Sequence, residues 1–330
     1  MRIAFFSTLP FEQTSFEPYR SHHHITYITE TLTPETAQRA EGHTAVCAFV
    51  NDDLSRPTLT RLKELGVGVI GMRGTGLDNL DQLALRDLGM TLLHIPGYSP
   101  SSVAEMSVAL LMSLVRHVPE ASQRVRAGNF TIDGLMGTDL HGKTVGVVGT
   151  GHIGRAFVRI MQGFGCHVLA YDIRPNRKLL DTGVRYTSLT ELLRQSDIMS
   201  LHCPLNPLTD YLINAQALAL MKPGALLINT GRGRLVDTRA VLNALDSGQL
   251  GGYAADVYER ERAYFHYDFS DSPITDPLLN QLRTHPNVLL TAHQSFLTKE
   301  AMQQISRGLM NQLSFYENQQ TALVTKASMC

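Results

Sequence analysis

Gly149-Thr150-Gly151-His152-Ile153-Gly154 separates a short apolar run, Thr144 to Val148, from a segment with helical spacing, Ile153 to Phe164. A second apolar run, Val168 to Tyr171, comes next. This order of strand, glycine-rich turn, helix and strand is the one that a dinucleotide site requires. In such a unit Gly149 permits the tight turn and Gly151 lets the backbone approach a pyrophosphate at the helix N-terminus. Gly154 lets the helix pack closely on the strand.

The second strand of this unit ends at a carboxylate. Asp172 follows Tyr171 and stands 18 positions after Gly154. A carboxylate there can accept hydrogen bonds from both ribose hydroxyls and would repel a 2′-phosphate, so the sequence favours NAD over NADP. Arg174, two residues further on, keeps NADP open as an alternative. A glycine turn without a ligand, with Asp172 facing solvent, is the less favoured interpretation.

The remainder of the chain predicts two α/β domains with parallel sheets, both Rossmann-like or flavodoxin-like. After residue 172, short apolar runs alternate with helix-like segments such as Thr238 to Ser247, which predicts a doubly wound sheet. These runs are Ile198 to His202, Ala225 to Asn229, Tyr253 to Val257 and Val288 to Thr291. An independent α/β pattern fills the first hundred residues, with runs at Arg2 to Phe6, Ala45 to Phe49, Gly68 to Met72 and Thr91 to His94.

Two long helical segments connect these patterns. Val103 to Arg116 carries the chain into the second domain, and Lys299 to Asn318 has no strand after it, so we expect it to return to the first. We therefore predict a substrate (catalytic) domain of residues 1–99 and 297–330. The NAD-binding Rossmann domain, residues 100–296, is inserted into it. The cleft between two such domains is the default ligand site.

The composition is that of an ordinary globular protein. The 330 residues are 43% hydrophobic and 18% charged, enough for two domains with cores. Twenty-nine basic against 30 acidic side chains give a formal charge of −1, so no whole-chain field favours nucleic acid or an anionic membrane, and we expect a small-molecule partner. No apolar stretch reaches the roughly 18 to 20 residues of a membrane-spanning helix.

Further features favour a cytoplasmic protein without a metal. The chain starts in a strand-like run without a charged leader, which argues against a cleavable signal. Its four cysteines are far apart and match no paired metal spacing, as expected of reduced thiols: Cys47, Cys166, Cys203 and Cys330. Three consecutive histidines, His22 to His24, invite a metal interpretation. Because neighbouring side chains of a strand point to alternate faces, we interpret them as surface or packing residues.

An arginine, a histidine and one of two glutamates carry the candidate chemistry. Arg232 lies in a glycine loop just beyond a strand end, where ligands collect in open α/β sheets, and a guanidinium can hold a carboxylate by two parallel hydrogen bonds. His293 closes the last predicted strand, and a carboxylate beside it would stabilise the imidazolium form of a proton carrier. Glu259 and Glu261 are equally good partners by chemistry alone.

The chain resembles the D-isomer-specific 2-hydroxyacid dehydrogenases, and among them most the fermentative D-lactate dehydrogenases of bacteria. The resemblance runs nearly end to end through the glycine fingerprint and six further motifs. These are Phe49-Val50-Asn51-Asp52-Asp53, Pro96-Gly97-Tyr98-Ser99-Pro100, His202-Cys203-Pro204-Leu205, Asn229-Thr230-Gly231-Arg232-Gly233, Asp256-Val257-Tyr258-Glu259-Arg260-Glu261 and His293-Gln294-Ser295-Phe296. It implies Arg232, Glu261 and His293 as the catalytic trio, with Glu261 at the matching position.

The resemblance also implies the ligand contacts. Those of NAD would be Gly149, Gly151, His152, Ile153, Gly154, Asp172, Cys203, Pro204, Thr230, Gly231 and Asp256. Those of the substrate, besides Arg232 and His293, would be backbone at Thr75 and Gly76 and the pocket-closing aromatics Tyr98 and Phe296. Ala292, Gly97 and Thr75 depart from residues that are common in relatives at these positions, which bears on the substrate and leaves the reaction class intact.

These observations predict an NAD-dependent D-lactate dehydrogenase that reduces pyruvate by hydride transfer from NADH. A preference for a bulkier 2-keto acid such as phenylpyruvate is the alternative, because one pocket residue can change the preferred side chain. A nucleotide-sensing binding module on the same fold is a more distant one. The resemblance further implies a homodimer or homotetramer.

Overall fold

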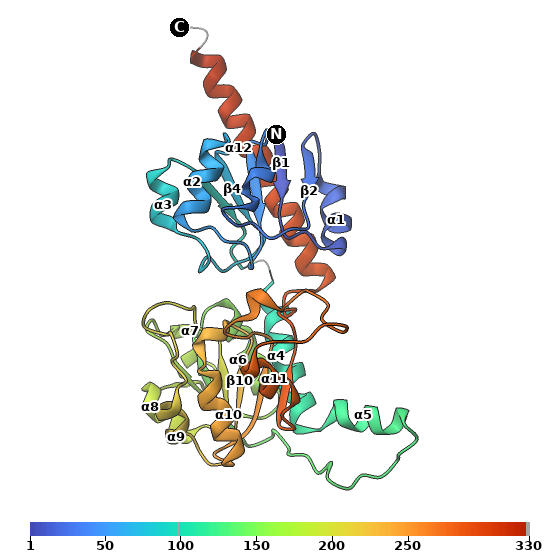
Figure 1. Ribbon diagram of the computed structural model, residues 1–330. Coiled ribbons are helices and arrows are strands. Elements are labelled where there is room, and N and C mark those ends of the chain that lie inside the picture. Colours follow the sequence, from blue (N-terminus) through green and yellow to red (C-terminus); the bar gives the residue numbers. More distant parts are fainter. Residues whose placement is uncertain (98, 328–330) are drawn as a thin grey trace. The chain divides into compact units, whose positions relative to one another are not determined.

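The computed structural model describes residues 1–97 and 99–327, with side chains as far as Gln319. Tyr98, one of the predicted substrate contacts, lies outside the described residues. The chain divides into two compact units (Figure 1). Unit 1 consists of Met1–Ser99 and Leu297–Cys330, and unit 2 is Pro100–Phe296.

Unit 1 is built on a five-stranded sheet of order β2-β1-β3-β4-β5, in which every described pairing is parallel. This is the flavodoxin-like order. The strands are β1 (Arg2–Phe5), β2 (His24–Tyr27), β3 (Ala45–Ala48), β4 (Val69–Met72) and β5 (Thr91–His94). β3 and β4 are buried along their whole length, as expected of parallel strands covered on both faces. The short helices between them are α1 (Pro10–Phe16), η1 (Glu17–Tyr19), η2 (Thr36–Ala40), α2 (Arg56–Glu64) and α3 (Gln82–Asp87).

The long helix α12 (Lys299–Ala327) belongs to unit 1 (Figure 1). Its apolar stripe is buried, with Ile305, Leu309 and Leu313 at most 1% exposed. A Cβ on Gly71 of β4 would come within 3.3 Å of the Leu309 side chain, so the missing side chain lets the helix lie close to the sheet. α12 extends beyond the segment that the sequence predicted, which ended at residue 318.

Unit 2 holds a seven-stranded sheet of order β12-β11-β10-β9-β6-β7-β8, again with parallel pairings only among the described residues. The order reverses between β6 and β9, the switch point at which doubly wound sheets bind ligands. The strands are β6 (Thr144–Val148), β7 (His167–Tyr171), β8 (Arg185–Tyr186), β9 (Ile198–Leu201), β10 (Ala225–Asn229), β11 (Leu250–Ala255) and β12 (Val288–Leu290). The predicted fold class, two α/β parts with parallel sheets, is thus confirmed.

Helices of unit 2 cover its sheet, apart from α5 (Val118–Arg126), which has no buried residue and projects from the body of the unit (Figure 1). The others are α4 (Pro100–Val115), α6 (His152–Gly163), α7 (Arg177–Leu180), α8 (Leu189–Gln195), α9 (Ala215–Leu220), α10 (Thr238–Asp246) and α11 (Pro277–Thr284), with short turns η3 (Gly233–Leu235) and η4 (Glu261–Ala263). Several begin at a polar side chain that accepts a hydrogen bond from the first turn and so satisfies an otherwise unpaired N–H: Asn176, Ser188, Asn214, Asp237 and Asp276. Within the described residues no helix is long and apolar enough to cross a membrane.

One premise of the sequence analysis is wrong. β2 begins only at His24, so His22 and His23 lie in the preceding turn and do not alternate across a strand. Their rings lie side by side, with centroids 4.3 Å apart.

Candidate active site

The turn between β6 and α6 contains three glycines, and each position needs glycine for a different reason. Gly149 has a φ of +92°, a conformation that disfavours other residues, and a Cβ there would lie 2.7 Å from the backbone of His202 and Cys203. A Cβ on Gly154 would collide with the Gly149 carbonyl at 2.0 Å. Around Gly151 no atom lies within 4 Å of the Cβ position, so its backbone is open to a ligand.

Asp172 follows β7 and is tied to this turn. Its Oδ2 accepts hydrogen bonds from the backbone N–H (2.6 Å) and the hydroxyl (2.9 Å) of Thr150, and its Oδ1 accepts one from Arg174 N–H at 2.8 Å. Burial works against ionisation, but these three donors outweigh it and hold the pKa of Asp172 below its ordinary value. The site therefore presents an ionised carboxylate beside the glycine turn.

The segment after β9 lies against the same turn at the switch point of the sheet. His202 Nε2 is 2.9 Å from the hydroxyl of Ser200, and its ring packs on Phe157 with centroids 4.9 Å apart. Burial lowers the pKa of His202 to about 3 and raises the pKa of the Cys203 thiol to about 11. Both groups are therefore neutral at physiological pH.

The loop after β10 is built around Asn229. Its Oδ1 accepts from Gly231 N–H at 3.1 Å and its Nδ2 donates to the Arg232 carbonyl at 2.9 Å, which fixes the course of the loop. Thr230 is buried and its hydroxyl lies 2.7 Å from that of Ser107 on α4. A Cβ on Gly233 would stand 2.1 Å from the Tyr258 carbonyl carbon, so the Arg232 loop packs directly on the segment that leads to Glu261.

Asp256, at the end of β11, holds the loop that carries His293. Its Oδ1 accepts from Thr291 Oγ1 (2.6 Å) and Gln294 N–H (2.9 Å), and its Oδ2 accepts from the N–H (2.7 Å) and hydroxyl (2.5 Å) of Ser295. The Asp256 carbonyl also accepts from His293 N–H at 2.6 Å. The resemblance implied a cofactor contact for Asp256, but all the hydrogen bonds described for this fully buried side chain position the loop.

His293 and Glu261 form a close pair. His293 Nδ1 lies 2.6 Å from Glu261 Oε1, while Glu261 Oε2 accepts from the Tyr258 N–H at 2.9 Å. The two side chains are 12% and 14% exposed. Because a carboxylate only accepts, the proton on Nδ1 faces Glu261, and Nε2 is the ring nitrogen that this contact does not use. Glu259, the chemical alternative, faces Arg260 instead, with Oε1 3.7 Å from the guanidinium Nε.

Sequence reasoning missed one neighbour of this pair. His266 Nε2 lies 3.4 Å from the His293 carbonyl, and the two ring centroids are 6.4 Å apart. The pKa of His266 lies below its ordinary value, mainly because the ring is buried and also because His293 repels its charged form. The sequence could not predict this contact, because His266 lies 27 residues before His293 in an irregular segment without a recognisable pattern.

The other predicted ligand residues are distributed over both units. His152 and Ile153 begin α6, the former exposed and the latter half-buried, and Pro204 follows Cys203. Phe296 is buried at the end of unit 2. Thr75 and Gly76 lie in unit 1, in the loop that follows β4.

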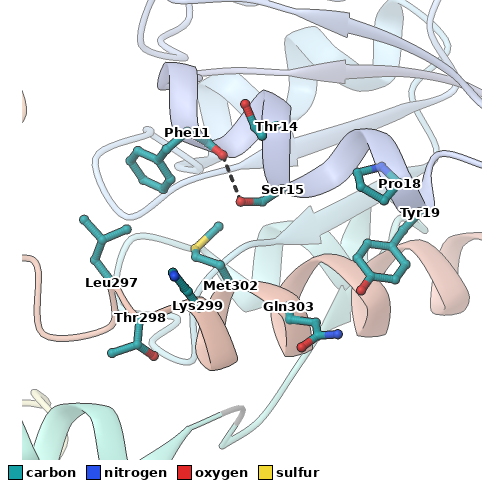
Figure 2. A pocket seen from close by; sticks show the side chains of 10 residues that line it. All are labelled: Phe11, Thr14, Ser15, Pro18, Tyr19, Leu297, Thr298, Lys299, Met302 and Gln303. Carbon is teal, nitrogen blue, oxygen red and sulfur yellow. Dashed lines mark hydrogen bonds between the residues drawn. The ribbon is translucent and has the colours of Figure 1, made fainter.

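A pocket of about 420 Å³ lies elsewhere, within unit 1 between α1, η1 and the start of α12 (Figure 2). Phe11, Tyr19 and Met302 give it apolar walls, and Lys299 is its one charged lining residue. It contains no acid or histidine that could move a proton, so we do not assign the candidate chemistry to it.

Comparison with known proteins agrees with this geometry. Residues 108–295 match the model of the D-isomer specific 2-hydroxyacid dehydrogenase NAD binding domain. The D-lactate dehydrogenase of Escherichia coli is 41% identical over 97% of the chain and 98% of its own length.

Two solved structures are also similar. The pyruvate reductase of Chlamydomonas reinhardtii has a TM-score of 0.88 at 39% identity, with 96% of each chain covered. The D-lactate dehydrogenase of Aquifex aeolicus, complexed with NAD and lactic acid, has a TM-score of 0.87 at 29% identity, with 98% of each chain covered. The chain therefore belongs to the D-isomer specific 2-hydroxyacid dehydrogenase family and is an NAD-dependent oxidoreductase.

Proposed function

We propose that the protein interconverts pyruvate and D-lactate, with NAD as its cofactor. The observation that carries the proposal is the 2.6 Å contact between His293 and Glu261 in the same unit as the Arg232 loop. A proton carrier backed by a carboxylate, together with a guanidinium, is what the reduction of a 2-keto acid needs. The names of the relatives support the substrate, since one is a pyruvate reductase and two are D-lactate dehydrogenases.

The residues beside the glycine turn fit NAD. The open backbone at Gly151 leaves room for a pyrophosphate at the start of α6, and we expect the ionised Asp172 to accept hydrogen bonds from the adenosine ribose. An ionised carboxylate repels a 2′-phosphate, so we expect NADH to be preferred over NADPH. When bound, NADH supplies the hydride.

The chain's own residues would then perform three tasks. The Arg232 guanidinium binds the carboxylate of the keto acid and polarises the ketone beside it. His293 donates the Nε2 proton to the ketone oxygen as negative charge develops there. Glu261 stabilises the imidazolium form before the transfer and keeps the ring oriented, while Asp256 fixes the backbone of the same loop.

The test is steady-state NADH oxidation with pyruvate, 2-oxobutyrate, phenylpyruvate, glyoxylate and hydroxypyruvate, followed by chiral analysis of the product. We expect pyruvate to have the highest kcat/KM and the product to be D-lactate, with NADPH much less effective. A higher kcat/KM for phenylpyruvate would replace the substrate with a bulkier keto acid. NADH binding without turnover on any of the five acids would overturn the proposed activity.

We further propose that the protein works as a cytoplasmic homodimer or homotetramer. The segment from α5 to β6 projects from the body of unit 2 (Figure 1) and exposes large apolar side chains: Phe130 is 76%, Ile132 81% and Met136 92% exposed. Apolar side chains gathered on a projecting segment are typical of a protein interface. Light scattering coupled to gel filtration tests the proposal, and a monomeric mass at micromolar concentration would contradict it.

A further inference from the structure

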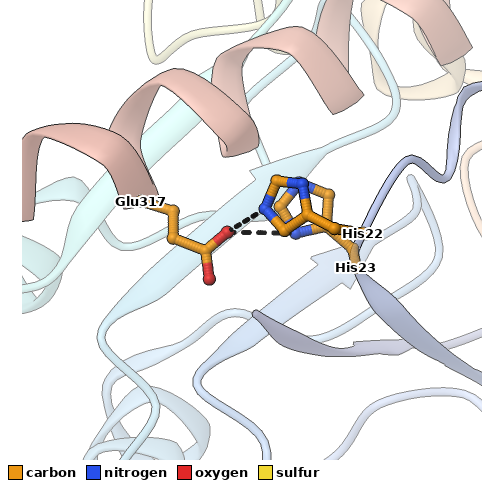
Figure 3. A group of neighbouring side chains, drawn as sticks. All are labelled: His22, His23 and Glu317. Atoms are coloured by element: carbon orange, nitrogen blue, oxygen red, sulfur yellow. Dashed lines mark hydrogen bonds and ion pairs between the residues drawn. The ribbon is translucent and has the colours of Figure 1, made fainter. Parts of the chain in front are cut away.

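Three potential metal ligands from distant parts of the sequence meet on unit 1 (Figure 3). His22 and His23 lie in the turn before β2, and Glu317 projects from α12, 295 positions after His22. One ligand atom from each side chain lies within 4.8 Å of the others. His24, the third histidine of the run, begins β2, is exposed and takes no part in the cluster.

One distance between ligand atoms is close to that expected around a coordinated ion. Bonds of about 2.0 to 2.1 Å in a tetrahedral zinc site place neighbouring ligand atoms roughly 3.3 Å apart. His23 Nδ1 lies 3.4 Å from Glu317 Oε2. His22 Nε2 is nearer, at 2.6 Å, because it now shares a proton with the carboxylate. The His22 side chain is 55% exposed, so it is able to shift outward when an ion replaces that proton.

Each of the three side chains also has an outer partner. His23 Nε2 is 2.8 Å from the Ser314 hydroxyl, and His22 Nδ1 is 3.2 Å from that of Ser21. The second carboxylate oxygen of Glu317 accepts from the Met1 amino group at 2.6 Å, which leaves Oε2 for the cluster. Hydrogen bonds of this kind orient metal ligands, and they are found around most protein metal sites.

The N-terminal amino group indicates the protonation state of His23. It lies 3.2 Å from His23 Nδ1 and can only donate, so this nitrogen carries a lone pair, which accepts from the amino group here and would bind the ion in its place. A neutral imidazole and an ionised carboxylate are the forms that bind metal ions.

We propose that His22, His23 and Glu317 bind a zinc ion, with water in the fourth position. Two imidazoles and one carboxylate are a ligand set that zinc accepts in proteins, and an open fourth position is common in sites with three protein ligands. The ion would link the turn before β2 to α12. It would therefore stabilise unit 1 rather than take part in the hydride transfer.

The experiment uses the untagged chain after removal of metals with a chelator. Zinc affinity is measured by calorimetry, and the absorption spectrum with Co²⁺ in place of zinc reports the coordination number. We expect one zinc ion per chain, a tetrahedral Co²⁺ spectrum and a rise in Tm with zinc, since an ion that binds only the folded state stabilises it. His22→Ala and Glu317→Gln each weaken zinc binding at least about tenfold, because even the loss of an outer partner costs about 10- to 100-fold.

His24→Ala is the matched control, because it removes a histidine of the same run that lies outside the cluster. We expect it to retain the zinc affinity and the zinc-dependent Tm of the unaltered chain. Equal weakening by His24→Ala and His22→Ala would overturn the proposal, since binding would then belong to the run of histidines. Zinc uptake no greater than that of the His22→Ala/Glu317→Gln double variant would also overturn it and leave the cluster as an ion pair that ties α12 to the first residues.

Discussion

Two histidines of unit 2 stand just beyond parallel strands of the same sheet, and they differ in what they meet there. His202 follows β9 and contacts the hydroxyl of Ser200, whereas His293 follows β12 and contacts the carboxylate of Glu261. Burial lowers the pKa of His202 to about 3, so its imidazole is neutral throughout the physiological range. A hydroxyl does not offset the cost of charging a buried ring, while an ionised carboxylate does.

The comparison teaches that the end of a strand gives a histidine its place but not its role. The role depends on the partner and on whether one ring nitrogen remains available. In His293 the Nδ1 proton is directed at Glu261, and in our proposal Nε2 faces the substrate. In His202 the Nε2 atom is already engaged by Ser200, and Phe157 covers the ring.

The largest effect should come from removing the proposed proton carrier. His293→Gln keeps a polar side chain of similar size but has no proton to donate near neutral pH, so kcat for pyruvate reduction should fall by about 10²- to 10⁴-fold. Stopped-flow or long-time NADH assays measure the loss, and fluorescence titration should give an unchanged Kd for NADH. A kcat within threefold of the unaltered enzyme would exclude His293 as the proton carrier.

Exchanging the partner of His293 should have the next largest effect. In Glu261→Gln the Nδ1–H of His293 loses its ionised acceptor, and a hydrogen bond to a charged group contributes about 1.5 to 3 kcal/mol. Because the ring that donates the proton is then no longer backed by a carboxylate, kcat for pyruvate reduction should fall about tenfold or more, which steady-state NADH oxidation measures.

Glu259→Gln is the matched control for this exchange, two positions away and oriented toward Arg260. It should leave kcat for pyruvate reduction unchanged. Equal losses of kcat in the two variants would mean that the reaction depends on the net charge of the segment and not on the contact with His293.

The choice between these two glutamates marks how far the sequence alone could predict the candidate site. Arg232 and His293 were found because both follow apolar strands, and that position can be read from the pattern. Spacing left Glu259 and Glu261 equivalent, and only the family resemblance favoured Glu261. The contact depends on the turn in which Tyr258 N–H donates to Glu261 Oε2, and no local pattern encodes it. The roles of these residues stay predictions until the variants are measured.

The fold was more predictable in its centre than at its edges. The bounds of β6 and β10 match the predicted runs, because buried parallel strands are continuously apolar. β2 and β8 were not predicted. Both are edge strands, and their residues are only half-buried or exposed, so no apolar run marks them. Without such a run, the three histidines were assumed to lie in a strand together, which is the wrong premise about His22 and His23.

His202, the buried histidine of the comparison, should affect the stability of the protein rather than the reaction rate. The folded state keeps His202 neutral down to about pH 3, whereas the unfolded chain binds a proton at its ordinary pKa of 6.5. Below pH 6.5 unfolding therefore takes up a proton, and the free energy of unfolding falls by about 1.4 kcal/mol per pH unit on account of this residue. In His202→Gln this contribution is absent.

Urea unfolding at pH 7.0 and 5.5 measures that difference. The unaltered protein should lose more stability over this interval than His202→Gln, while other groups, including His266, contribute equally to both. Parallel losses in the two proteins would show that His202 accepts a proton in the folded state, and the contrast with His293 would then disappear.

The smallest effect should come from His266, which supports His293 without facing the substrate in our proposal. His293 has a φ of +51°, a conformation that costs energy for a residue with a side chain, and the His266 ring nitrogen at its carbonyl helps to hold it. Losing one such hydrogen bond costs about 0.5 to 1.5 kcal/mol, so His266→Phe should lower kcat about two- to tenfold, with KM for pyruvate unchanged. His266→Gln can still donate to the same carbonyl and should restore most of kcat. If Phe and Gln at this position behave alike, the hydrogen bond has no part in placing His293, and the contrast between the two strand-end histidines rests on Glu261 and Ser200 alone.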